Sequence, residues 1–113
     1  MAVSEVGLAF AQKAFIVHDG ELLLVRKSAT DPLHPDLWEV PGGRLDVAGD
    51  RDLDDHIRRE VWEEVGLTID PGPPFYQWDW WIPDGSGRLR VVAVARTCRA
   101  ITTAGQHRPP GSG

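Results

Sequence analysis

Three glutamates lie close together in residues 59–67, whose sequence is R-E-V-W-E-E-V-G-L. Glu60, Glu63 and Glu64 have offsets i, i+3 and i+4, which place side chains on one face of a helix. Like charges at this spacing cost a helix roughly 0.2–0.5 kcal/mol per pair, and a bound cation is the simplest way to relieve them. Carboxylate oxygens without His or Cys favour Mg²⁺ or Mn²⁺. A solvated acidic face has the same spacing, so the surrounding sequence must decide.

The residues around these acids predict the helix that positions them. An apolar stripe adjoins the acidic arc when the segment is projected at about 100° per residue; it consists of Ile57, Val61 and Val65. We expect a helix over residues 52–65. Asp50 or Asp52 is suited to cap its start, and Gly66 is suited to end it.

A glycine turn precedes this helix. Residues 37–40, L-W-E-V, predict a short strand that runs into Pro41-Gly42-Gly43. A glycine backbone turns sharply and exposes its carbonyls to close approach, although an ordinary turn between strands has the same composition. Residues 44–51 then form a loop, which gives the order strand, glycine turn, loop, acidic helix.

The first part of the chain predicts a β-hairpin. Residues 9–18 and 21–27 flank Asp19-Gly20, a dipeptide that favours a tight turn. The Leu-Leu-Leu-Val run at 22–25 does not alternate, so we expect that strand to be covered on both faces in the sheet interior. Arg26 and Lys27 at its end are candidates to bind a phosphate, although a strand end that emerges into solvent often carries such charges.

A second hairpin is predicted after the helix, from strands at 75–82 and 88–100. On the first of these strands, four apolar side chains alternate onto one face: Tyr76, Trp78, Trp80 and Ile82. Residues 102–113 are rich in Gly, Pro, Ser and Thr, and we expect a disordered tail. The whole chain is therefore interpreted as one domain over 1–101 followed by this tail.

Composition excludes several classes of protein. At 113 residues the chain has room for a single domain. A net charge of −5 argues against general binding of nucleic-acid backbones. No apolar run approaches the roughly 20 residues of a membrane span. Cys98 is the only cysteine, and no signal segment opens the sequence, so we expect a cytoplasmic protein that is not bound to membranes.

Taken together, Gly42-Gly43 and residues 59–67 resemble the signature of the Nudix hydrolase family. The family pattern R-E-U-x-E-E-x-G-U, where U is a bulky aliphatic residue, is matched at every position of 59–67. The resemblance covers residues 43–67, and the strands from about 9 to 100 fit the family's fold. It implies an α/β protein, an α/β/α sandwich around a mixed β-sheet, shortened here at the C-terminus.

The same resemblance implies hydrolysis of a nucleoside diphosphate linked to another moiety, with Mg²⁺ or Mn²⁺ as cofactor. By position it assigns Glu60, Glu63 and Glu64 to the metal and to catalysis, with a backbone carbonyl from Gly42. Arg59 would orient the glutamates through charge-assisted hydrogen bonds. Which carboxylate acts as general base differs between members of the family.

The sequence departs from the family pattern in the loop before the helix. Fifteen residues separate Gly43 from Arg59, where the family has thirteen. Counting back from Arg59 places Arg51 where the family has its first glutamate, although the neighbouring Asp50 is able to supply a carboxylate if the longer loop shifts. We expect this difference to affect loop geometry more than metal binding.

Two alternatives to an enzyme acting on a nucleotide or nucleotide-sugar follow from the same residues. One is a Nudix-like module that binds a nucleotide or a partner protein without efficient turnover. The other, removal of an RNA cap, is disfavoured by the acidic charge.

Substrate contacts are harder to assign from the sequence. Trp38, Trp78 or Trp80 is able to stack on a base, a contact worth about 1–3 kcal/mol, but aromatic residues on strands more often lie in a core or an interface. We assign Arg26, Lys27 and Trp38 to substrate binding. The aromatic strand face also predicts a homodimer in which a partner covers it, the alternative being a monomer whose own loops do so.

Overall fold

The computed structural model describes residues 6–32, 35–85 and 87–101. The predicted tail at 102–113 lies outside these ranges. Within them the chain forms seven strands and one helix, in the order β1 (Gly7–His18), β2 (Glu21–Leu22), β3 (Val25–Arg26), β4 (Trp38–Glu39), β5 (Gly42–Arg44), α1 (Leu53–Val65), β6 (Ile69–Asp84) and β7 (Gly87–Ala100).

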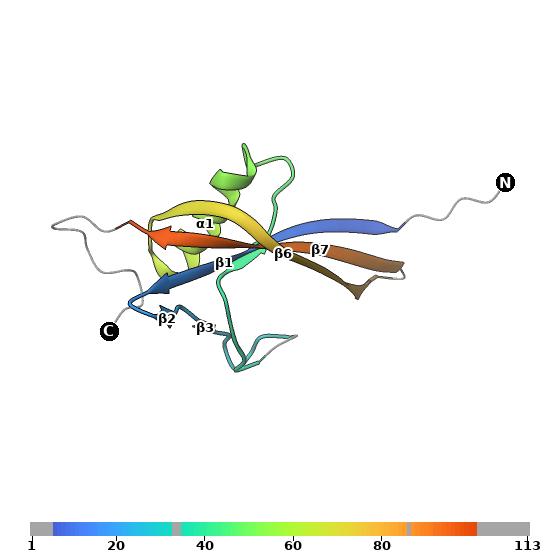
Figure 1. Ribbon diagram of the computed structural model, residues 1–113. Helices are drawn as coiled ribbons and strands as arrows, with labels where there is room; N and C mark the ends of the chain where they lie inside the picture. The colour runs from blue at the N-terminus through green and yellow to red at the C-terminus, as the bar shows by residue number, and fades with distance from the viewer. Residues whose placement is uncertain (1–5, 33–34, 86, 102–113) are drawn as a thin grey trace.

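Five strands form one mixed sheet in the order β2-β1-β7-β6, with β5 paired to β1 (Figure 1). The long central strands β1 and β7 are parallel, and their register runs from Gly7 opposite Leu89 to Ile16 opposite Cys98. Parallel neighbours need a crossover connection, and the segment that connects them contains α1. β6 pairs antiparallel with β7. β3 and β4 form a separate two-stranded sheet.

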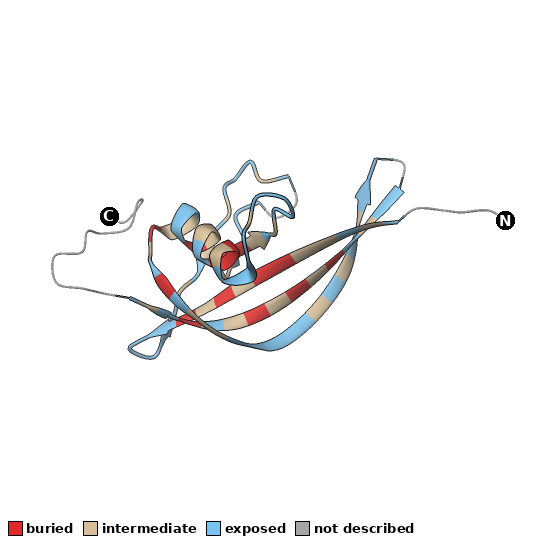
Figure 2. Cartoon of the chain, turned by 90° about the horizontal axis from the view of Figure 1, so that it is seen from above, coloured by how far each residue is buried: buried red, intermediate tan, exposed pale blue. Residues whose placement is uncertain are grey.

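Helix α1 begins and ends at the residues that the sequence indicates. The Asp52 side chain accepts a hydrogen bond from the Asp55 backbone N–H, and Gly66 adopts the left-handed conformation at the C-terminus. The apolar stripe of the helix packs on one face of the sheet (Figure 2). The buried cluster beneath it comprises Ala14, Ile16, Ile57, Val61, Ile69 and Cys98.

A second, smaller apolar cluster is centred on residues of β1 and β7. Its buried members are Ala11, Val91 and Ala93. Trp78, Trp80 and Ile82 of β6 pack against it and are partly buried. Tyr76 stacks on Trp78 and Trp78 on Trp80, with ring centroids 5.8 and 6.3 Å apart. The expected alternation of this strand is therefore confirmed.

The prediction for residues 21–27 was wrong in two respects. The segment breaks into β2 and β3, and Leu22 and Leu24 are 41% and 42% exposed. β2 stands at the end of the strand order, paired only to β1. Leu23 alone of this leucine run packs against the helix-side cluster. An edge strand of two residues packs one face only, so an unbroken apolar run did not mean burial on both faces.

The second hairpin is longer than predicted, since β6 begins at Ile69 rather than at 75. Its first part continues across three prolines, and the pairing with β7 shifts register near Pro71 and Pro74. Proline lacks the N–H that a regular ladder uses, so the prolines at 71, 73 and 74 concealed the start of the strand in the sequence.

The α/β class with a mixed sheet is confirmed. No helix in the described ranges is long and apolar enough to cross a membrane.

Candidate active site

Gly42 ties the glycine turn to the acidic helix. Its backbone N–H donates a hydrogen bond to Glu64 Oε1 at 3.0 Å. Its φ is +147°, and a Cβ at this position would collide with the backbone of Gln12 and Lys13 on β1. A side chain at 42 is therefore excluded by both conformation and space. The close approach of β5 to β1 fixes where the carboxylate of Glu64 is held.

Gly43 provides the same kind of space for Glu60. A Cβ on Gly43 would lie 2.6 Å from Glu60 Oε2, so the carboxylate packs directly against the glycine backbone. Burial raises the pKa of Glu60, although the neighbouring Arg59 opposes that change. Burial also raises the pKa of Glu64, against the hydrogen bond from Gly42 and the charges of Lys27 and Lys13. Two partly buried carboxylates thus flank the Gly42-Gly43 backbone.

Arg59 joins the remaining acids of the helix to the preceding loop. Its Nε and Nη2 donate to the two oxygens of Asp50 at 2.9 and 3.0 Å. Its Nη1 donates to Glu63 at 3.1 and 3.2 Å, and Nη2 lies 3.3 Å from Glu60 Oε1. These contacts lower the pKa of Asp50 to about 2, chiefly through the Arg59 hydrogen bonds, and raise that of Arg59.

The longer loop therefore brings Asp50, rather than Arg51, to the guanidinium of Arg59. Arg51 is exposed and pairs with Asp55 at 2.8 Å and with Asp52 at 3.7 Å. The aspartate occupies the inner position because the loop residues before it turn on themselves, with the Asp46 N–H donating to Asp50 Oδ2 at 2.8 Å.

Polar side chains that are fully buried lie beneath the start of the helix. His56 and Gln12 have no exposed surface, and the Gln12 amide nitrogen lies 2.7 Å from His56 Nδ1 and 2.7 Å from the Leu53 carbonyl. Burial lowers the pKa of His56. Sequence reasoning did not select these residues. The one signal available was a polar Gln-Lys pair in the middle of an otherwise apolar strand.

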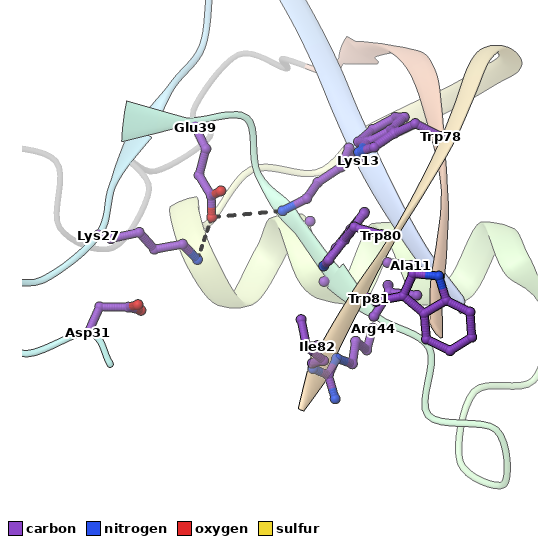
Figure 3. Close-up of a pocket in the computed structure, with 13 residues that line it drawn as sticks. Ala11, Lys13, Lys27, Asp31, Glu39, Arg44, Trp78, Trp80, Trp81 and Ile82 are labelled. Carbon is purple, nitrogen blue, oxygen red and sulfur yellow. Dashed lines mark ion pairs between the residues drawn. The ribbon is translucent and has the colours of Figure 1, made fainter. Parts of the chain in front are cut away.

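A cleft of about 670 Å³ opens beside Gly42 and Gly43 (Figure 3). Lys27 Nζ pairs with Glu39 Oε1 at 2.9 Å, and Lys13 Nζ lies 3.8 Å from the same oxygen. The Glu39 hydrogen bond raises the pKa of Lys27. The other residues that line the cleft include Ala11, Arg44, Trp78, Trp80 and Ile82. Two ammonium groups and an aromatic wall thus share one concave surface.

The three side chains assigned to substrate from the sequence are not brought together. Lys27 lines the cleft, whereas Arg26 and Trp38 are not among its lining residues. Arg26 pairs with Asp36 at 3.3 Å and lies 5.9 Å over the exposed Trp38 ring. Lys13, which the sequence did not single out, lies on the cleft instead. Arg26 and Lys27 are neighbours in an extended segment and point to opposite sides, so only Lys27 of the two lines the cleft.

Comparison with known proteins identifies the family. The model of the NUDIX domain matches residues 10–110. The chain belongs to the NUDIX domain family. Among solved structures, the MutT protein from Methanosarcina mazei Go1 is similar over 89% of this chain and 70% of its own, with a TM-score of 0.70 and 27% identity.

Two curated proteins are similar in sequence to this chain, one from a bacterium and one from a mammal. Phosphatase NudJ from Escherichia coli is 31% identical over 80 residues, which are 70% of this chain and 49% of NudJ. The m7GpppN-mRNA hydrolase NUDT17 of Bos taurus is 41% identical over 54 residues, 48% of this chain and 17% of that enzyme. The chain therefore spans at most about half the length of these relatives.

The acids of this NUDIX domain suit a hard divalent cation by their chemistry. In the described part of the chain, no three His, Cys, Asp or Glu side chains are gathered closely enough to hold an ion. Glu60 and Glu64 nevertheless present partly buried carboxylate oxygens beside the backbone of the glycine turn. The Glu60 carboxylate fills the space that a Cβ at position 43 would need. Oxygen donors of this kind fit Mg²⁺. Glu63 is exposed and held by Arg59.

Proposed function

We propose that this protein is a Mg²⁺-dependent hydrolase that cleaves the diphosphate linkage of a nucleoside diphosphate joined to another moiety. Membership of the NUDIX domain family supports this class of reaction. The observation that carries the proposal is the placement of Glu60 and Glu64 against Gly42 and Gly43, whose backbone also borders the cleft. The two carboxylates and the cleft therefore both border the backbone of Gly42 and Gly43.

The lysines of the cleft provide the positive charge for a diphosphate. Lys13 and Lys27 both face Glu39, and Glu64 also lies within range of their charges. A phosphate that enters here replaces Glu39 as their partner, since ammonium groups bind phosphate oxygens as point charges. Trp78 and Trp80 line the same cleft. Their rings offer a stacking surface for the base, a contact worth about 1–3 kcal/mol.

Glu60, Glu63, Glu64 and the Gly42 carbonyl are the proposed metal ligands, with Mn²⁺ as a substitute for Mg²⁺. A bound cation of this type polarises phosphoryl oxygens and lowers the pKa of water. Arg59 holds Glu60 and Glu63 in a shared ion-pair network. Burial raises the pKa values of Glu60 and Glu64, and a carboxylate beside the attacking water would serve as general base.

A screen for hydrolysis tests the proposal. The panel should contain normal and oxidised nucleoside triphosphates, ADP-ribose, nucleotide sugars, dinucleoside polyphosphates and a capped RNA, each with Mg²⁺ or excess chelator. We expect Mg²⁺-dependent release of phosphate or nucleotide from at least one small nucleotide. Glu21→Gln, an exposed carboxylate of β2, is the matched control for changes at Glu64.

Two outcomes would replace the proposal. Binding of nucleotides with no turnover across the panel would establish the alternative, a NUDIX module that binds a nucleotide or a partner protein. Turnover of capped RNA in preference to small nucleotides would assign the chain the substrate named for its mammalian relative. We do not expect a preference for capped RNA, because the net charge of −5 disfavours binding of a nucleic acid.

A further inference from the structure

His56 is the buried polar side chain that the proposed reaction does not use. It lies on α1 one turn before Glu60, has no exposed surface, and its Nε2 has no hydrogen-bond partner in the described residues. Buried polar atoms without a partner are rare in folded proteins. The Nε2 atom lies 3.8 Å from Glu60 Oε1. Backbone groups of Arg44 and Gly43 also lie close enough to the ring to raise its pKa by hydrogen bonding, so they compete with Glu60 for the Nε2–H.

The contacts of Gln12 determine which nitrogen of this ring carries the proton. Arg96 Nη1 lies 3.2 Å from Gln12 Oε1, and a guanidinium has donors only. The oxygen of the Gln12 amide must therefore face Arg96. The Arg96 side chain is itself fixed, because its Nε donates to the Gly72 carbonyl at 2.8 Å and its Nη2 pairs with Asp54 at 2.7 Å.

With the amide so oriented, the NH₂ group of Gln12 faces the Leu53 carbonyl and His56 Nδ1. An amide nitrogen only donates, so His56 Nδ1 accepts and carries no proton. The neutral ring then has its hydrogen on Nε2. Arg96, Gln12 and His56 form one chain of donors that ends in an N–H next to Glu60.

We propose that His56 is a positioning residue for Glu60, whose Nε2–H closes a hydrogen bond to the carboxylate when Glu60 binds the divalent cation. This inference rests on the proposed function. It also excludes His56 as a metal ligand, because Nε2 has no free lone pair in this tautomer. Such partners of ligating carboxylates typically change metal affinity or activity 10–100-fold.

Three variants separate positioning from packing. His56→Gln keeps an acceptor toward Gln12 and a donor toward Glu60, so we expect Mn²⁺ affinity within about threefold of the wild type. His56→Phe keeps the bulk and loses both, so we expect affinity to fall about tenfold or more. Ile57→Val, a buried neighbour on the same helix, is the control for lost stability and should leave Mn²⁺ affinity unchanged.

The measurements are Mn²⁺ binding by electron paramagnetic resonance without nucleotide, and ¹⁵N NMR of the His56 ring in the wild-type protein. We expect a protonated Nε2 and an unprotonated Nδ1. A protonated Nδ1, or wild-type Mn²⁺ affinity in folded His56→Phe, would overturn the inference. The second result would mean that Nε2–H serves the Gly43 or Arg44 backbone instead.

If His56→Phe does not fold, Gln12→Glu provides the decisive variant. A carboxylate at 12 accepts from both Arg96 and His56, so it moves the ring proton to Nδ1 and leaves a lone pair facing Glu60. It also loses the donor to the Leu53 carbonyl, so thermal unfolding of this variant is measured beside its Mn²⁺ affinity. We expect the reversed tautomer and an approximately tenfold loss of Mn²⁺ affinity; unchanged affinity with the tautomer reversed would refute the role. Absence of hydrolysis by the wild type on every substrate would refute the proposed function, whereas the Mn²⁺ and NMR results would still decide the role of His56.

Discussion

The two faces of the central sheet are held in different ways. On one face, α1 packs over a buried aliphatic cluster, and Arg59 forms ion pairs with Asp50, Glu60 and Glu63. On the other face, the second cluster is smaller, its indole rings are only partly buried, and the cleft opens against them. The helix side thus fixes charged groups, while the aromatic side leaves surface for a ligand.

The largest effect that this contrast predicts is on catalysis. Glu64→Gln and Glu60→Gln each remove a negatively charged ligand from the proposed cation. A bound cation of this kind stabilises the transition state by several kcal/mol. At about 1.4 kcal/mol per tenfold, kcat should fall a hundredfold or more. Circular dichroism should show an intact fold in both variants. Full activity in excess chelator, or wild-type kcat in both, would contradict the metal assignment.

The two faces should differ next in stability. Ile57→Ala leaves a cavity under the helix and should lower the free energy of unfolding by about 2–5 kcal/mol. Tyr76→Ala on the aromatic side, where the ring is 63% exposed, should cost no more than roughly 0.5 kcal/mol. Urea titrations measure both values. Equal losses would show that the aromatic side is part of the core.

The paired glycines at the boundary of the faces should respond differently to one added methyl group. Gly42→Ala is strained by its positive φ and meets the β1 backbone, so it should destabilise the fold by roughly 1–3 kcal/mol. The atoms nearest to a methyl group at Gly43 are those of the Glu60 carboxylate, a side-chain end that is able to move aside. We expect Gly43→Ala to leave the melting temperature nearly unchanged and to lower kcat, as measured by steady-state kinetics. Unchanged kcat would mean that the Glu60 position does not matter.

The network on the helix side should also make stability depend on acid pH. The folded pKa of Asp50, about 2, lies below its ordinary value of 3.8. The Asp50–Arg59 pair therefore stabilises the protein above pH 3.8, and this contribution is lost as pH falls toward 2. Asp50→Asn should remove that part of the pH dependence in thermal unfolding curves, whereas Arg51→Ala should retain it.

Arg51→Ala should also leave kcat close to the wild-type value. A kcat as low as that of Glu64→Gln would require Arg51 to lie at the reacting centre.

The smallest expected effect concerns assembly on the aromatic side. We predict a homodimer in which a partner covers β6, because Phe75 and Tyr76 on this strand are exposed and such patches favour association. Light scattering over a dilution series should give a dimer mass that Tyr76→Ser reduces. A monomer mass at micromolar concentrations, the same for both proteins, would assign the aromatic side to ligand binding alone.

The sequence by itself determined the features that depend on short spacing. The helix, its Asp52 and Gly66 ends, the apolar stripe and the order of acids follow from offsets of three or four residues, and all are present in the structure. Alternation on β6 likewise predicted which aromatic side chains share a face. Each of these features is set by backbone periodicity, which a linear pattern contains in full.

Only the tertiary structure decided which distant residues meet. Gln12 contacts Arg96 across 84 positions of sequence and His56 across 44, and no local pattern marks such pairs. Lys13 lies on the cleft because the pairing of β1 with β5 places it opposite Gly42, whose backbone borders the same cleft. The leucine run at 22–25 is partly exposed because β2 lies at the sheet edge. Strand order and register arise from packing across the whole chain, so spacing along the sequence cannot specify them.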